Sequence, residues 1–153
     1  MAQTRFSGPV VSDNGFVGDI TGDITGNIAG TSTITHATTA AINATATATA
    51  AQVATGYITS TSAAATTITL PTGTLLGAAL GAAQGTVFDL YIDNTAGADT
   101  VTVAVATNGI LSSAATDTAG SFGDLTIAAG ATGVGRFTIM FSSATAYVFT
   151  RTA

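Results

Sequence analysis

Large apolar side chains alternate with polar ones in several short segments of the second half of the chain. The clearest is residues 87–93, where Phe88, Leu90 and Ile92 fall on one face of an extended backbone. Strict alternation of this kind predicts a β-strand with one buried face. The same pattern predicts further strands at residues 57–61, 66–70, 99–106, 124–128, 135–141 and 146–151.

A short segment from Asn94 to Ala98 separates two of these predicted strands and has the Asn and Gly content typical of a turn. We therefore expect residues 87–93 and 99–106 to pair as a hairpin. Short strands at this spacing, joined by turns rich in Gly, Ser and Asn, are typical of antiparallel sandwiches and barrels. The sequence thus predicts an all-β fold, with an antiparallel β-sandwich or jelly-roll-like domain over residues 57–153.

One segment between the predicted strands has a helical pattern instead. Thr72 is placed to cap a helix over residues 74–84, and Gly85 to stop it. Gly77, Gly81 and Gly85 recur every fourth residue, a spacing that indicates helix dimerisation inside a membrane span. Because no apolar span surrounds them, we interpret the segment as a loosely helical connection between two strands.

The first part of the chain, residues 1–56, is poor in large apolar side chains. Between residues 29 and 56 these are Ile34, Ile42 and Val53. Burying so little apolar surface cannot offset the entropy cost of ordering the chain. We therefore expect residues 1–56 to form an extended N-terminal arm that is ordered by contact with a partner. Within it, the Ala/Thr-rich residues 37–54 favour extended or irregular structure, although alanine also favours helix.

A four-residue repeat lies inside this arm. Glycines recur at positions 18, 22, 26 and 30, and an Ile stands two residues after each of the first three. Gly-rich segments are usually flexible linkers, but the regular Ile indicates a chain that places one apolar side chain per unit on a neighbouring surface. The predicted contact residues are Phe16, Val17, Ile20, Ile24 and Ile28.

Charge is scarce along the whole sequence. The 153 residues include three Lys or Arg and eight Asp or Glu, and no charged residue lies between Asp23 and Asp89. Such a stretch stays soluble if hydroxyl groups cover it or if a partner does. Three scattered arginines do not form a phosphate-binding patch, so we expect no nucleic-acid partner. No apolar run reaches the roughly 18 residues of a membrane span, and no signal peptide is recognisable, which predicts a protein made in the cytoplasm with no membrane partner.

Candidate chemistry is sparse as well. The one histidine, His36, lies in a segment with too little core to hold a catalytic imidazole in place, so we expect a surface or interface position for it. Asp89 and Asp93 lie four residues apart on one strand face, too far apart to share an ion. The sequence contains no cysteine. We therefore predict no enzyme, and no catalytic, cofactor-binding or metal site.

Exposed aromatic side chains are the remaining candidates for binding. Tyr91 projects from the polar face of its predicted strand, and Tyr147 and Phe149 share a face near the C-terminus. An exposed aromatic platform is one way to bind a glycan. Packing in the core or against another subunit is the favoured interpretation, because large aromatic residues usually lie in such places.

Four segments carry a resemblance to known proteins. They are SGPVVSDNGFVG (residues 7–18), TGYITSTSAAATTITLPT (55–72), TVFDLYIDNT (86–95) and IAAGAT (127–132). In these segments and in their order, the chain resembles small β-rich phage virion proteins of the capsid decoration (cement) and head-fibre type. The resemblance implies a virion protein, often a homotrimer, that sits on a capsid shell and reinforces it.

These observations lead to one expected function and two alternatives. We expect a capsid decoration protein on the virion surface, with the major capsid protein and further copies of itself as partners. The first alternative is a tail- or head-fibre module that binds a host surface glycan through its aromatic residues. The second is a self-assembling fibre or sheath subunit whose arm pairs with the next copy.

Overall fold

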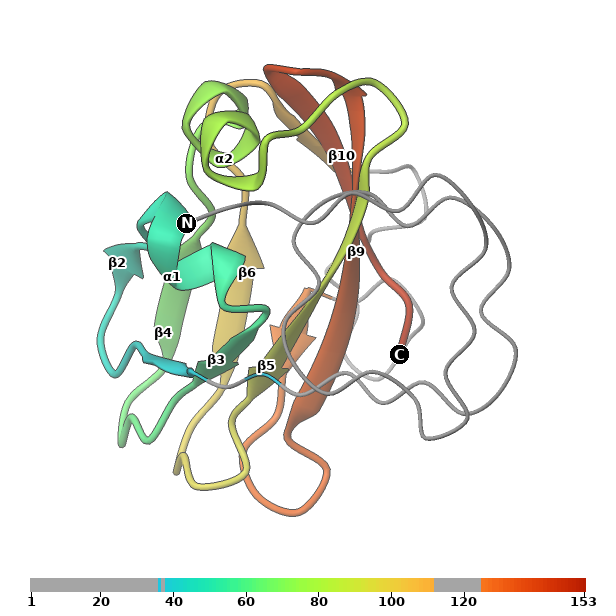
Figure 1. Cartoon of the computed structure of the whole chain (residues 1–153). Coiled ribbons are helices and arrows are strands. Elements are labelled where there is room, and N and C mark those ends of the chain that lie inside the picture. The colour runs from blue at the N-terminus through green and yellow to red at the C-terminus, as the bar shows by residue number, and fades with distance from the viewer. Residues whose placement is uncertain (1–35, 37, 112–124) are drawn as a thin grey trace, which may run out of the picture. The chain divides into compact units, whose positions relative to one another are not determined.

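The computed structural model describes residue 36, residues 38–111 and residues 125–153 of the chain (Figure 1). The chain divides into two units, Met1–Thr33 and Ile34–Ala153, and all described residues belong to the second. The predicted contact residues of the arm, which are Phe16, Val17, Ile20, Ile24 and Ile28, lie outside the described residues.

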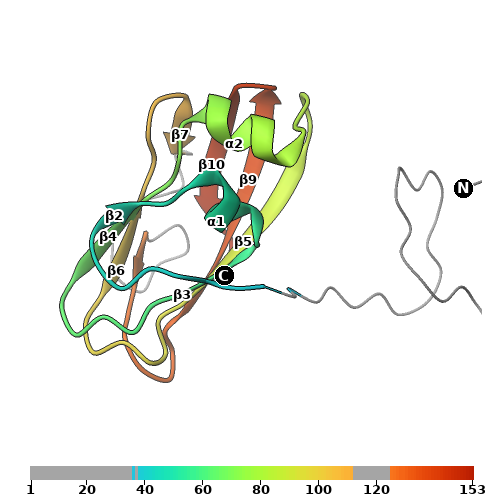
Figure 2. The ribbon, with the colours of Figure 1, turned by 60° about the vertical axis from the view of Figure 1, so that its left-hand side comes forward.

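Two β-sheets form the framework of the described part. The six-stranded sheet contains, in spatial order, β1 (Ala40–Ala41), β3 (Tyr57–Thr59), β5 (Val87–Asp93), β9 (Val134–Ser143), β10 (Ala146–Arg151) and β7 (Gly109–Leu111). The four-stranded sheet contains β2 (Ala46–Thr47), β4 (Thr66–Thr69), β6 (Val101–Ala104) and β8 (Thr126–Ile127). Figure 2 shows β4 and β6 on one side of the domain and β5 and β9 on the other, with α2 at the upper end.

From β1 to β6, successive strands of the chain alternate between the two sheets, so the chain winds around the core in one sense. Strand β1 is followed by β2 in the other sheet, β3 by β4, and β5 by β6. Successive strands of one sheet lie side by side and run parallel, β1 with β3 and β5, and β2 with β4 and β6. Strands β8, β9 and β10 then add antiparallel pairs, and β7 pairs parallel with β10.

The expected all-β antiparallel sandwich is therefore wrong. The fold is mixed α/β, with parallel and antiparallel pairs in both sheets and with helices α1 and α2 between strands. The physical reason is the winding: a chain that leaves a sheet, crosses to the other and returns in the same sense must run parallel to its earlier strand. An alternating pattern fixes which face of a strand is buried, but it does not fix the direction of the neighbouring strand.

The predicted hairpin of residues 87–93 and 99–106 is wrong for the same reason. Strand β5 belongs to the six-stranded sheet and β6 to the four-stranded sheet, so the loop between them crosses the domain. Asn94 begins this loop with a fully buried side chain. Its Nδ2 donates hydrogen bonds to backbone carbonyl oxygens in the loop and at β8, which are those of Asp99 (2.9 Å), Ala128 (3.1 Å) and Ile127 (3.3 Å).

Helix α1 (Ala50–Ala54) connects β2 to β3 and is stabilised by a cap at its N-terminus. Thr49 caps it: the Thr49 hydroxyl accepts a hydrogen bond from the backbone of Gln52, and the Gln52 side chain accepts one from the backbone of Thr49. Val53 on this helix is fully buried. Strands β1 and β2 and helix α1 lie within residues 1–56, the range expected to form the arm.

Helix α2 (Gly73–Leu80) connects β4 to β5, as the helical pattern predicted. The predicted cap is confirmed, because the Thr72 hydroxyl accepts a hydrogen bond from the backbone of Leu75. The helix ends earlier than expected, at Gly81 and not at Gly85. Gly81 has a φ of 59°, a left-handed conformation that suits glycine and terminates the helix.

The core lies between the two sheets. Its large buried residues come from both of them, and they are Ile58, Leu90, Ile92, Phe137, Ile139, Phe141, Tyr147 and Phe149 from the six-stranded sheet and Ile68, Val101, Val103 and Ile127 from the four-stranded sheet. Phe137 and Phe149 stack with their centroids 4.9 Å apart. The core interpretation of Tyr147 and Phe149 is confirmed, since both are fully buried.

Candidate functional site

A pocket of about 430 Å³ opens on the outer face of the six-stranded sheet, on the side away from the core. It is lined by His36, Tyr57, Val87, Phe88, Asp89 and Tyr91. Strand β5 contributes most of these residues. Because its side chains alternate, Leu90 and Ile92 enter the core while Val87, Asp89 and Tyr91 face outward.

Three of the four aromatic rings that line the pocket lie close together, and the fourth is that of the partly buried Phe88. Tyr57 and Tyr91 are direct partners across the parallel strands β3 and β5. The centroid of the His36 ring lies 6.1 Å from that of Tyr57 and 5.9 Å from that of Tyr91. Beneath the imidazole is Gly56, which has a φ of 74° and at which any side chain would collide with the His36 ring.

His36 has a defined orientation. Its Nδ1 atom lies 2.8 Å from the carbonyl oxygen of Thr55. A carbonyl oxygen is an acceptor, so Nδ1 carries the proton and donates this bond. The His36 ring is half-buried and its Nδ1 atom faces the backbone. At this position the ring forms one side of the pocket.

The polar part of the pocket is centred on Asp89. Arg136 donates a 2.6 Å hydrogen bond to Asp89 Oδ2, and the Thr138 hydroxyl donates one of 2.9 Å to Oδ1. The Arg136 bond is the main reason that the pKa of the Asp89 carboxyl is lowered. The Arg136 guanidinium also lies over the Tyr91 ring, 5.8 Å from its centroid.

A second carboxylate, Asp93, lies at the end of the same strand and fixes the Tyr57 hydroxyl. It accepts a 2.8 Å hydrogen bond from Tyr57 and two bonds from Thr95, 2.6 Å from the hydroxyl and 2.9 Å from the backbone. The bond from the Thr95 hydroxyl is the largest cause of the lowered pKa of Asp93. The bond to Asp93 is in turn the main reason that the pKa of Tyr57 is raised.

The two carboxylates suit accepting hydrogen bonds better than transferring protons. A general acid or base works best with a pKa near the working pH, whereas the pKa values of Asp89 and Asp93 are both lowered. Among the described residues, no group of three His, Cys, Asp or Glu side chains is placed to hold a metal ion. What the pocket offers is aromatic ring surface beside the carboxylate of Asp89, which Arg136 and Thr138 hold in place.

The sequence anticipated part of this site. The alternating pattern placed Tyr91 on the outer face of its strand, which is confirmed. Tyr57, Arg136 and Thr138 were not recognised as members of the site. The alternation of β9, with Phe137 buried, assigns Arg136 and Thr138 to the outer face, but bringing them to Asp89 and Tyr91 depends on the pairing of β5 with β9.

Comparison of the chain with protein-family models, with curated proteins and with solved structures gives no match. Within the part of the chain that the structure describes, neither helix has the length and apolar character that crossing a membrane requires.

Proposed function

We propose that this protein is a non-enzymatic structural component of a phage particle, a capsid decoration protein that binds the assembled shell. In this proposal the Ile-containing repeat near the N-terminus contacts the major capsid protein, and the domain at residues 34–153 sits on the outer surface, with trimers as the functional unit. The resemblance of the chain to small phage virion proteins supports this function, and the surface of the domain supports it independently.

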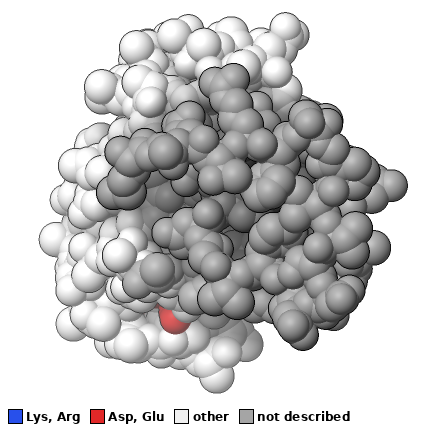
Figure 3. All heavy atoms as spheres, in the orientation of Figure 1, with Lys and Arg blue, Asp and Glu red and all other residues white. Residues whose placement is uncertain are grey.

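The observation that carries the proposal is the scarcity of charge on the described surface. The charged side chains in that part of the chain are Asp89, Asp93, Asp99, Arg136 and Arg151, and Asp89 and Arg136 pair with each other. Figure 3 shows little charge on the described part of one face. A free protein normally carries more charge to stay apart from its neighbours, so such a surface favours lasting association.

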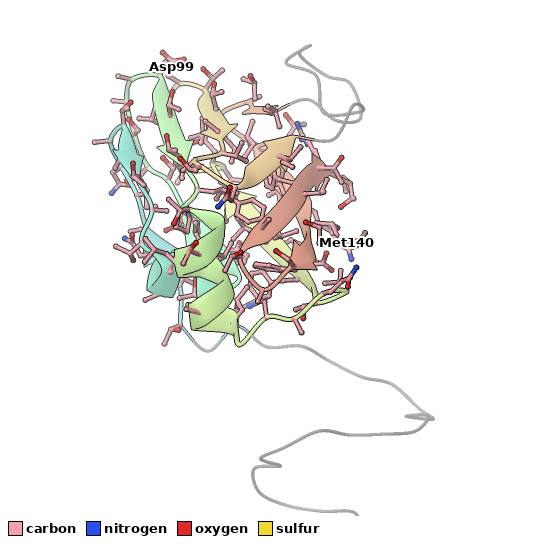
Figure 4. The ribbon with its side chains drawn as sticks, turned by 90° about the horizontal axis from the view of Figure 1, so that it is seen from above. Asp99 and Met140 are labelled. Carbon is pink, nitrogen blue, oxygen red and sulfur yellow. The ribbon has the colours of Figure 1, made fainter. Side chains whose placement is uncertain are left out.

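Exposed apolar side chains point in the same direction. Val87 on β5 and Met140 on β9 are direct partners in the sheet, and 58% and 51% of their surfaces are exposed. Met140 points away from the domain (Figure 4). Adjacent apolar side chains left in solvent are typical of surfaces that become covered in an assembly, whereas apolar side chains exposed singly are common on any surface.

The mechanism is mass action on the assembled shell. A protein that binds the complete lattice but not free capsid subunits stabilises the lattice by the free energy of binding. At a free concentration a hundredfold above Kd this amounts to about 2.7 kcal/mol per site. A capsid with many such sites would resist heat and pressure better when decorated.

Co-sedimentation of the full chain with empty expanded capsids of the phage that encodes it tests the proposal, with the solution mass measured in parallel. We expect saturable binding by a trimer and a higher disruption temperature for decorated capsids. A variant with Ile20, Ile24 and Ile28 changed to Ser should lose binding, while the control Leu75→Ser, at a single exposed residue of α2, should keep it. Absence of binding by the unmodified chain would contradict the proposal, and filaments formed by the chain alone would favour a fibre subunit.

A further inference from the structure

We propose that the pocket formed by β3 and β5 binds a neutral saccharide ring, with Tyr57 and Tyr91 as the stacking surface and Asp89 as the acceptor of sugar hydroxyl groups. This inference concerns the domain alone and does not depend on attachment to a capsid. It therefore adds a second binding surface to a protein whose proposed role is structural.

Size and wall chemistry support a sugar as the ligand. A volume of about 430 Å³ lies within the range of small-molecule sites. The walls combine four aromatic rings with the apolar side chain of Val87, and the rings are those of His36, Tyr57, Phe88 and Tyr91. A pyranose ring presents C–H groups on its faces and hydroxyl groups around its edge. The faces match aromatic rings and the edge matches fixed hydrogen-bonding groups.

The polar groups are placed to bind hydroxyl groups. Asp89 uses one oxygen for Arg136 and the other for Thr138, and each carboxylate oxygen has a second lone pair that accepts a further bond. Arg136, which does not itself line the pocket, holds this carboxylate in place with its 2.6 Å bond. An ionised acceptor forms the short, strong hydrogen bonds that fix a sugar hydroxyl.

The charges of the pocket favour a neutral ligand over a cation. Four aromatic rings beside a carboxylate also suit a quaternary ammonium ion. Here, however, the charge of Asp89 is already matched by Arg136 at 2.6 Å, and the same guanidinium lies 5.8 Å from the centre of the Tyr91 ring. A second cation at this place would be repelled by Arg136. An anion would lie against the Asp89 carboxylate that lines the pocket and would be repelled by it.

The site is also organised before any ligand binds. The Tyr57 hydroxyl is held by Asp93, and the His36 ring by the carbonyl oxygen of Thr55. Arg136 is held by Asp89. Fixed side chains lower the entropy cost of binding, so a small ligand can be retained by few contacts.

The test is titration of the full chain with the methyl pyranosides of glucose, galactose, mannose and N-acetylglucosamine, followed by saturation-transfer NMR and calorimetry. Tetramethylammonium chloride is the probe for the rival cationic ligand. We expect at least one glycoside to bind with transfer to its ring C–H protons, and we expect tetramethylammonium not to bind. Binding of tetramethylammonium alone, or of no glycoside, would overturn the inference.

Variants then assign the binding to the pocket. Tyr91→Ala should weaken binding at least tenfold, about 1.4 kcal/mol, whereas Tyr91→Phe keeps the ring and should bind nearly as well as the unmodified chain. Asp89→Asn should also weaken binding, and it provides the answer if Tyr91→Ala fails to fold. The control is Ile110→Ala, an exposed residue on β7 at the opposite edge of the same sheet. Equal affinities for Asp89→Asn and the control would exclude this pocket.

Discussion

Arg136 on β9 donates a hydrogen bond of 2.6 Å to Asp89 on the adjacent strand β5. The two residues are not directly opposite each other, because the partner of Asp89 in the sheet is Thr138 and that of Arg136 is Tyr91. The bond therefore runs diagonally across the strands and joins both of these pairs. This places one guanidinium against a carboxylate and a tyrosine ring at the same time.

The first prediction is a pH-dependent effect of Asp89→Asn. The pKa of Asp89 is lowered from its ordinary value of 3.8, chiefly by the hydrogen bond from Arg136. A lowered pKa in the folded state contributes stability that is present above 3.8 and is lost as the pH falls through the lower folded value. The Tm of the variant should thus lie slightly below that of the unmodified chain at neutral pH, and the difference should disappear in acid.

Thermal unfolding of both chains over a pH series, at low and high salt, measures this effect. The difference in Tm should be small and should shrink at high salt, because the pair is about one-third exposed at Asp89 and more exposed at Arg136. A difference in Tm that grows as the pH is lowered would contradict this account of the pair.

The second prediction concerns the hydroxyl of Tyr147, which donates a 2.9 Å hydrogen bond to the carbonyl oxygen of Pro71 inside the core. Tyr147→Phe should lower the free energy of unfolding by about 1–3 kcal/mol, since it leaves a buried carbonyl without its donor. Urea denaturation at neutral pH measures this loss. A change near zero would indicate that the bond to Pro71 contributes little.

The same residue predicts behaviour in alkali. Burial raises the pKa of Tyr147 from 10.0 to about 12, so the folded state holds this proton more tightly than the unfolded state. The corresponding stability is complete below pH 10.0 and is lost as the pH rises through about 12. The unmodified chain should therefore lose more stability over this range than Tyr147→Phe. Denaturation of both chains in that range, with phenolate absorbance as a second readout, tests the assignment.

The sequence predicted β3 to β6 and β8 to β10 and their buried faces, because these depend on local alternation, but it did not predict β1, β2 or β7. The alternation of Leu90 and Ile92 on β5, and of Tyr147 and Phe149 on β10, matches the observed burial. Pairing and direction depend on how the chain returns after each crossing, for which alternation carries no signal. This is why β5 and β6 were expected to form one hairpin and instead belong to different sheets.

The Ala/Thr-rich residues 37–54 favour extended or irregular structure without deciding against helix, and this ambiguity has a different cause. Alanine is too small to mark a buried face, although Ala40 and Ala48 are both buried. Backbone hydrogen bonds hold the segment to the sheets, from Ile42 to Thr59 at 2.9 Å and from Ala48 to Thr69 at 2.8 Å. The sequence does not indicate the pocket, because the pocket depends on the parallel register that sets Tyr57 beside Tyr91.

The third prediction separates two roles of asparagine in the domain. The buried Asn94 side chain donates to three carbonyl oxygens through Nδ2. Asn94→Asp replaces this donor by a carboxylate oxygen, which the carbonyl oxygens repel. It should therefore destabilise the domain more than Asn94→Ala does. Loss of the bonds in Asn94→Ala alone should cost about 1–3 kcal/mol. The matched control is Asn43→Asp, because exposed Asn43 accepts its bond through Oδ1 and aspartate preserves that acceptor. Equal losses for Asn94→Asp and Asn43→Asp in urea denaturation would contradict the role of Asn94.

The fourth prediction is that alanine at position 77 destabilises the protein although alanine favours helices. Gly77 lies on the buried face of α2, where a side chain would overlap the carbonyl oxygen of Ala144 and come within 3.3 Å of the Phe141 ring. Gly77→Ala should gain about 1 kcal/mol of helix propensity and lose more than that to overpacking, which typically costs about 1–3 kcal/mol. The control is Ala79→Gly on the exposed side of the same helix, which should lose only the propensity, about 1 kcal/mol. Urea denaturation of both variants, with unchanged m-values, distinguishes overpacking from the change in helix propensity. A Gly77→Ala chain that is more stable than the original would show that α2 has room to move away from the turn between β9 and β10.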